Sequence, residues 1–99
     1  EHDSGEDQTW VQEKPGCYLA LARTPLDEFE AEIGVSLADA EDQEEIDTLG
    51  GLVFMLTGRI PTRGEVVPHE SGAQIEVVDA DPRRIKRLRV RLPSAAVTA

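Results

Sequence analysis

Cysteine is nearly absent from this chain of 99 residues, which contains only Cys17. A single cysteine excludes an internal disulfide, so the composition does not indicate an oxidising compartment. Cys17 lies in an apolar, strand-like run, which favours a buried, unreactive thiol over a nucleophile. Aromatic residues are also scarce, so aliphatic side chains must supply most of a small core; the aromatics are Trp10, Tyr18, Phe29 and Phe54.

Long apolar runs are missing as well. No segment approaches the ~20 residues that a membrane-spanning helix requires, so we expect no membrane insertion of this domain. The first eight residues, EHDSGEDQ, are acidic and polar, whereas a signal peptide begins with a basic region. They contain no apolar residue that burial could order, and we interpret residues 1–8 as an acidic linker from a preceding domain. Residues 93–99 are expected to form a loose tail.

Positive charge is scarce in the first half of the chain. Residues 1–47 contain fifteen acidic and two basic side chains, and residues 48–99 contain five and eight, which gives −13 and +3. This asymmetry predicts that the two halves meet different surroundings. The most acidic stretch, residues 38–47, lacks the central glycine of a calcium-binding loop, so we interpret it as a solvated surface loop and expect no metal site.

The segment Asp47–Glu65 carries the clearest structural signal, a helix with a defined start and end. Either Asp47 or Thr48 can cap its start. Gly58 can adopt the left-handed conformation at its end, and Pro61 prevents the helix from resuming. Apolar residues recur on one face of this helix; they are Leu49, Leu52, Val53 and Leu56. Phe54 and Met55 make a second side apolar, which predicts burial of more than half of the helix circumference.

A glycine pair, Gly50-Gly51, follows the start of this helix and costs roughly 0.8–1 kcal/mol per residue relative to alanine. One explanation is close packing of another segment against the bare backbone. The other is an anion at the helix N-terminus, where free N–H groups favour negative charge. Asp47 already places a carboxylate there, so we favour packing.

Two strands are predicted before this helix, on either side of a Lys14-Pro15-Gly16 turn. They comprise residues 9–13 and 17–23. In the second strand only alternate residues are bulky enough to form a core face; these are Cys17, Leu19 and Leu21.

A first helix is predicted to follow, with Thr24 as its cap and Pro25 in its first turn. Gly34 is expected to end this helix. Its buried stripe is expected to consist of Leu26, Phe29 and Ile33.

Alternation with period two replaces the helical pattern after the central helix. Residues 65–69 are predicted to form a short strand, and Pro68 suits an edge position. Residues 74–80 are predicted to form another strand, with Ile75 and Val77 on one face.

The final strand, residues 84–92, alternates most clearly. Ile85 is out of phase with the later residues, which predicts a β-bulge near Lys86. The inward set is Leu88, Val90 and Leu92, and the outward set is Arg87, Arg89 and Arg91. The order β-β-α-α-β-β-β predicts an α+β domain over residues 9–92, in which two helices pack on one face of an antiparallel sheet.

No catalytic constellation is evident in the sequence. His2 and His69 have no Cys or His neighbour at metal-ligand spacing. The sequence shows no Ser-His-Asp or Cys-His set, no P-loop lysine and no glycine-rich dinucleotide loop. We therefore expect no enzymatic activity from the chain's own side chains.

The basic run RRIKRLRVR, residues 83–91, is the other local signal. We favour an exposed strand face whose charges discourage edge pairing. The alternatives are contact with an acidic domain and binding of nucleic acid or nucleotide phosphates. The chain is acidic overall and interleaves no aromatics with these cations, so nucleic acid is not an expected partner.

These segments together resemble the transporter-associated domain of the CorC/HlyC family. The run DTLGGLVFMLTGRIPTRGE, residues 47–65, is similar to the family's central segment, and RRIKRLRVR is similar to its last strand. The upstream run Arg23–Phe29 matches as well, so the resemblance covers about residues 9–92. Glu1-His2-Asp3 is similar to the acidic end of the CBS pair that precedes the domain in the family.

The resemblance implies a C-terminal domain, on the cytoplasmic side, of a larger protein at the plasma (inner) membrane. Such proteins are linked to magnesium and cobalt efflux or are haemolysin-like, and many carry an N-terminal membrane domain. The implied partners are the CBS modules and membrane domain of the parent protein, and a second copy of the chain in a homodimer. We expect a non-enzymatic regulatory domain that modulates transport by docking on CBS modules or another subunit, a contact that the charge polarity suits.

The alternative is a module that binds an adenine or flavin nucleotide, because the family's fold is similar to part of a FAD-binding domain. The sequence itself shows no cofactor signature. Candidate residues for a small anionic ligand are Arg59 and Arg63, on either side of the Pro61 turn, together with Arg84. The candidate interaction surface is the outward set Arg87, Arg89 and Arg91.

Overall fold

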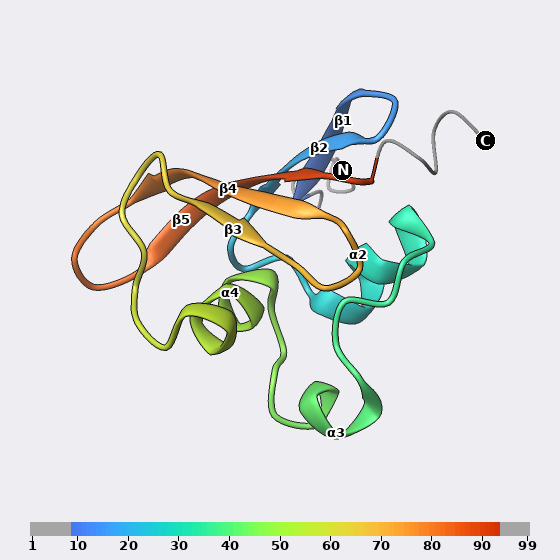
Figure 1. Ribbon diagram of the computed structural model, residues 1–99, viewed down its shortest axis with the longest axis horizontal. Helices are drawn as coiled ribbons and strands as arrows, with labels where there is room; N and C mark the ends of the chain where they lie inside the picture. The colour runs from blue at the N-terminus through green and yellow to red at the C-terminus, as the bar shows by residue number, and fades with distance from the viewer. Residues whose placement is uncertain (1–8, 94–99) are drawn as a thin grey trace, which may run out of the picture.

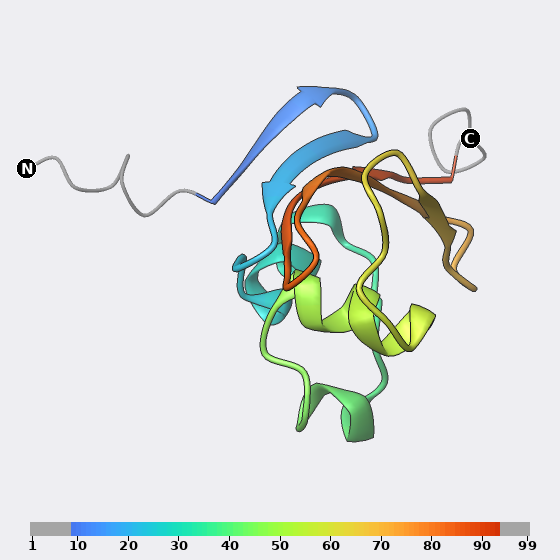
Figure 2. The ribbon, with the colours of Figure 1, turned by 90° about the vertical axis from the view of Figure 1, so that its left-hand side faces the viewer.

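The structure, a computed structural model, describes residues 9–93. Five antiparallel strands form one sheet in the order β1-β2-β5-β4-β3 (Figure 1). The sheet curves over α2 and α4, and α3 lies farther from it (Figure 2). The strands are β1 Trp10–Lys14, β2 Cys17–Leu21, β3 Val66–Pro68, β4 Gln74–Ala80 and β5 Ile85–Arg91; the helices are α2 Leu26–Ile33, α3 Ala40–Gln43 and α4 Leu49–Thr57. The predicted α+β class and strand order along the chain are confirmed, with α3 as an additional short helix.

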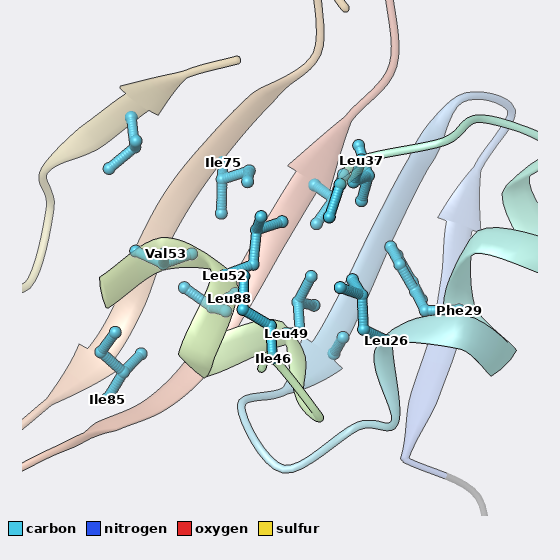
Figure 3. Close-up of a cluster of buried hydrophobic side chains, with 14 of the residues drawn as sticks. Leu26, Phe29, Leu37, Ile46, Leu49, Leu52, Val53, Ile75, Ile85 and Leu88 are labelled. Carbon is cyan, nitrogen blue, oxygen red and sulfur yellow. The ribbon is translucent and has the colours of Figure 1, made fainter. Parts of the chain in front are cut away.

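The core lies between the sheet and the helices α2 and α4 (Figure 3). Ile75 and Val77 of β4, predicted to share one face, are fully buried, and so are Leu88 and Val90 of β5, which were predicted to point inward. Phe29 of α2 is fully buried as well and meets the ring of Tyr18 edge-on, with 5.7 Å between ring centroids. Aliphatic side chains therefore make up most of the core, and the aromatic contacts close its β1–β2 end.

The prediction for the inward face of β2 is wrong. Tyr18 and Ala20 face the helices, and Leu19 and Leu21 do not belong to the core. In the β2–β5 pairing Tyr18 lies opposite Val90, and Ala20 lies opposite Leu88. Opposite residues share a face of the sheet, so the partner strand decides the orientation, and side-chain size does not.

Cys17 is buried, as predicted, although it belongs to the face that points away from the helices. Its Sγ lies 3.5 Å from Glu13 Oε1. Burial, followed by the neighbouring Glu13 carboxylate, raises the pKa of the Cys17 thiol. This position keeps the thiol protonated and unreactive.

The start of α2 differs from the prediction. Pro25 is the N-cap residue, and no side chain caps the helix. The Thr24 hydroxyl instead lies 2.6 Å from Leu21 O and 3.1 Å from Thr9 O, so it fastens the loop before the helix to the start of β1. Gly34 ends α2 in the left-handed conformation, as predicted.

The stripe of α2 that faces the core is shorter than predicted. Leu26 and Phe29 are buried, whereas Ile33 is only partly buried and packs at the margin of the core. The end of α2 therefore lies at the margin of the core.

The two ends of α4 are as predicted. Thr48 Oγ1 accepts a hydrogen bond from Gly51 N at 3.1 Å, and Gly58 has a φ of 74°. Leu49, Leu52 and Val53 are buried. The prediction that Leu56 belongs to this buried face is wrong, and the expected second buried side is absent, because α4 contacts the sheet with one face only. Three residues are exposed and form what we call the α4 strip: Phe54 at 49%, Met55 at 41% and Leu56 at 38%.

The acidic stretch 38–47 is more ordered than the predicted loop. It contains α3, which Asp39 caps by accepting a hydrogen bond from Asp42 N at 2.9 Å. The Glu30 carboxylate accepts hydrogen bonds from Leu37 N at 2.6 Å and Ala38 N at 3.1 Å. These bonds hold the start of the stretch against α2.

The strands of the second half follow the predictions. β3 is an edge strand and contains Pro68. In the β4–β5 ladder Asp79 pairs with Arg87 and Ala80 pairs with Ile85, so Lys86 is the extra residue of a bulge. Leu92, expected to point inward, is only partly buried. The predicted linker 1–8 and most of the tail 93–99 lie outside the described residues.

Gly50 is the closest contact between α4 and the rest of the fold. Its N–H donates to Ala22 O at 2.8 Å. A Cβ at Gly50 would lie 2.9 Å from Ala22 Cβ and 3.2 Å from Ala22 O, whereas one at Gly51 would meet nothing nearer than 3.4 Å. The prediction that packing explains the glycine pair is confirmed for Gly50.

We predict opposite effects for alanine at the two glycines. Gly50→Ala should lower the free energy of unfolding by about 1–2 kcal/mol, because overpacking outweighs the gain in helix propensity. Gly51→Ala, the matched control, should raise it by up to about 1 kcal/mol. Urea denaturation of the two variants measures both values. Equal destabilisation at both positions would show that the contact with Ala22 is not what requires glycine.

A second pair of variants tests the loop before α2. Thr9 Oγ1 is buried without a hydrogen-bond partner, whereas the buried Thr24 hydroxyl has two carbonyl acceptors within reach. Thr24→Val should therefore lower the free energy of unfolding by about 1 kcal/mol, and Thr9→Val should leave it unchanged or raise it. Thermal denaturation compares the two, and a larger loss from Thr9→Val would contradict the assignment.

Candidate functional site

The N-terminal turn of α4 has its backbone donors occupied. Leu49 N donates to Thr24 O at 2.9 Å, and Gly50 N donates to Ala22 O at 2.8 Å. Gly51 N donates to the hydroxyl of Thr48. An anion at this helix start would have to displace these bonds, so the turn is not a phosphate cradle.

A groove of about 460 Å³ lies beside this turn. Three segments that are distant in the sequence form it: the loop after β2, one side of α4 with the following Ile60, and the start of β5. The groove is predominantly apolar, with three cations and no carboxylate among its lining residues; these are Leu21, Ala22, Arg23, Thr48, Gly50, Gly51, Phe54, Ile60, Arg84, Ile85 and Lys86.

The cations of the groove are poorly neutralised. Lys86 Nζ lies 3.7 Å from Asp81 Oδ2, a long and exposed ion pair. Asp81 also accepts backbone hydrogen bonds from Arg83 and Arg84, at 2.8 and 2.9 Å, and these bonds lower its pKa. Within residues 9–93, the guanidinium groups of Arg23 and Arg84 have no carboxylate partner. They can therefore bind a carboxylate or phosphate from outside.

The structure does not gather the three arginines predicted to bind a small ligand. Arg84 lines the groove, whereas Arg59 and Arg63 do not. Arg59 forms a two-pronged pair with Glu65, with NH1–Oε1 at 3.1 Å and NH2–Oε2 at 2.5 Å. This hydrogen-bonded pair lowers the pKa of Glu65 and raises that of Arg59. The pair joins the two ends of the turn that contains Pro61.

The predicted interaction arginines point away from the helices, as expected, but carboxylates of the same chain hold them. Arg89 lies between Glu13 of β1, at 2.8 Å, and Glu76 of β4, at 3.2 Å. The hydrogen bonds that Arg89 donates to these two carboxylates raise the pKa of Arg89, and the bond to Glu13 lowers the pKa of Glu13. Arg91 also pairs with Glu76 at 2.9 Å, and Arg87 lies 3.6 Å from Asp79.

These pairs change the interpretation of the basic strand. β5 is the central strand of the sheet, so its charges do not protect an edge, and that expectation is wrong. The pairs connect β1, β5 and β4 across the face of the sheet opposite the helices. Each is exposed enough that its contribution to stability is small.

Sequence reasoning identified Arg84 but missed other groove residues, chiefly Arg23, Phe54 and Lys86. Phe54 escapes such reasoning because an apolar residue within a helix usually is buried. The sequence offers one signal for Lys86, the predicted β-bulge. A bulge interrupts the alternation of the strand, so Lys86 does not follow the inward and outward pattern of the later residues.

Other candidate chemistry is limited within residues 9–93. No group of three or more His, Cys, Asp or Glu side chains in this part of the chain is arranged to hold a metal ion. His69 is buried, with Nε2 2.6 Å from Leu37 O and Nδ1 2.8 Å from Ser71 Oγ, so it serves to fasten loops. None of the helices among the described residues has the length and apolarity to cross a bilayer.

Comparison with known proteins gives consistent matches. A family model, the transporter associated domain CorC_HlyC, matches residues 11–94. The chain is 34% identical over 93 residues to the magnesium and cobalt efflux protein CorC of Salmonella typhimurium, a match that covers 94% of this chain and 30% of the relative. The chain thus spans less than a third of the length of this curated relative.

Solved structures agree with the sequence matches. A CorC-associated region from Neisseria meningitidis has a TM-score of 0.74 and 28% identity, over 86% of this chain and 99% of that chain. The transporter-associated domain of a CBS domain protein from Porphyromonas gingivalis has a TM-score of 0.70 and 25% identity, over 87% of this chain and 98% of that chain.

The Arg59–Glu65 pair generates a prediction about pH. A carboxyl whose pKa is lowered by folding stabilises the fold above its ordinary pKa of about 4.3, and this contribution is lost as pH falls through the lowered value. Glu65→Gln should therefore lower the melting temperature at pH 7, and the deficit should shrink below pH ~4. Glu70→Gln, at an exposed position without an ion pair among the described residues, is the matched control. A deficit that persists at pH 3 would contradict the role of the pair.

Proposed function

This chain belongs to the CorC/HlyC transporter-associated domain family, and we propose that it is the non-enzymatic regulatory domain of a magnesium and cobalt efflux protein. The observation that carries the proposal is the match to CorC over 94% of the chain. The parent protein would lie in the plasma (inner) membrane with this domain on its cytoplasmic side. The CBS protein from Porphyromonas gingivalis, which contains the same domain, supports CBS modules as neighbours.

The proposed mechanism is docking. The domain binds the CBS modules or a second subunit in one transport state more tightly than in another, and so shifts the balance between the states. Couplings of this kind typically amount to about 1–3 kcal/mol, which corresponds to a change of roughly 5–150-fold in an equilibrium. Two features of the structure suit such a role: the exposed α4 strip and the cationic groove beside it.

Deletion of residues 9–92 from the whole protein tests the proposal. Efflux of Mg²⁺ and Co²⁺ from loaded cells should change by about 5-fold or more, because the transporter loses the contact that biases its states. The amount of protein in the membrane must be equal for both forms, and Glu70→Gln in the whole protein serves as the control. Unchanged efflux at equal protein amount would overturn the regulatory function.

A further inference from the structure

We propose that the groove beside α4 is the docking surface of this domain, and that its occupant is a segment of the parent protein that presents apolar side chains flanked by carboxylates. This inference rests on the proposed regulatory function and names the surface through which that function would operate. Three observations carry it: the exposed apolar residues, the cations without a carboxylate partner within residues 9–93, and the occupied backbone donors at the start of α4.

The apolar surface runs from the groove onto α4. Phe54 lines the groove and is 49% exposed, and its neighbours Met55 and Leu56 on α4 are exposed as well. The chain has only two phenylalanines, and the other, Phe29, is fully buried. Exposed apolar residues beside polar ones are typical of an interaction site.

The charge of the groove identifies the chemistry of the partner. The whole chain contains 20 acidic and 10 basic residues, yet no acidic residue lines the groove. Arg23 and Arg84 are unpaired within residues 9–93, whereas Arg89 is held by two carboxylates of its own chain. Complementarity therefore favours a partner with carboxylates placed to meet the guanidinium groups on the rim.

The surroundings favour a protein segment over a small nucleotide. A nucleotide phosphate would find the backbone donors at the start of α4 already bonded to Ala22 O, Thr24 O and the Thr48 hydroxyl. The α4 strip also extends beyond the groove, where a small ligand would leave it exposed. An amphipathic segment can place apolar residues against Phe54 and carboxylates against Arg84 together.

The parent protein can supply such a segment. The match to CorC covers only 30% of the relative's length, so most of such a protein lies outside this chain. A contact within one protein needs little intrinsic affinity, because the connection raises the effective concentration of the segment to the millimolar range. At such a concentration, a small groove with two guanidinium groups can hold the segment by weak contacts.

Photo-crosslinking in the full-length parent protein tests the surface. Phe54 is replaced by the photo-crosslinker p-benzoylphenylalanine, and Val11, which is 50% exposed on β1 and does not line the groove, is replaced in a matched control. Position 54 should crosslink to an acidic segment of the parent, and position 11 should not. Arg84→Glu should reduce the yield about 5-fold or more, while Arg63→Glu, an exposed arginine outside the groove, should leave it unchanged.

Several outcomes would overturn the assignment of the groove. Equal crosslinking from positions 54 and 11, or a yield that Arg84→Glu does not change, would show that the groove is not the docking surface. A product joining two copies of this chain would identify a dimer contact instead. Saturable loss of the crosslink on addition of FAD or ATP would identify a nucleotide site. If deletion of the domain changes efflux while position 54 gives no crosslink, only the surface is wrong and the regulatory function stands.

Discussion

The approach of the α4 backbone to Ala22 is the constraint on which the rest of the fold depends. Gly50 makes it possible, because a side chain at that position would collide with Ala22. Two further backbone bonds join the starts of the helices, Leu49 N to Thr24 O and Leu26 N to Asp47 O, both at 2.9 Å. The first hairpin, α2 and α4 therefore share one junction. The groove lies beside this junction, so the contact that fixes the fold also fixes the shape of the surface proposed for docking.

Features encoded by neighbouring residues could be predicted from the sequence. Thr48 and Gly58 mark the ends of α4 by local capping rules, and the alternation of Gln74–Ala80 matches β4 at both ends. Features that depend on distant partners could not. The inward face of β2 is set by its pairing with β5, and the exposure of Phe54 depends on how many layers cover α4. Neither fact is present in the local pattern.

The candidate site shows the same division. Arg84 could be selected from the sequence because it belongs to a visible basic run, but the sequence does not say which cations are neutralised. Glu13 holds Arg89 across 76 positions of the chain, and Glu65 holds Arg59 across a turn. Arg23 is isolated in an acidic half of the sequence, and only the fold shows that it lines the same groove as Arg84. The sequence shows where the basic residues are, whereas only the tertiary structure shows which of them have no carboxylate partner and can bind another molecule.

The hydrogen bonds at Thr9 have a mechanical consequence. Thr9 O accepts from Leu21 N at 2.8 Å and lies 3.1 Å from the hydroxyl of Thr24, so the chain enters the fold beside the loop that contains Arg23. Thr9 O thus joins the end of the β1–β2 pairing to this loop, so a displacement of Thr9 would disturb both. The loop that forms one wall of the groove is therefore hydrogen-bonded to the residue at which the chain enters β1.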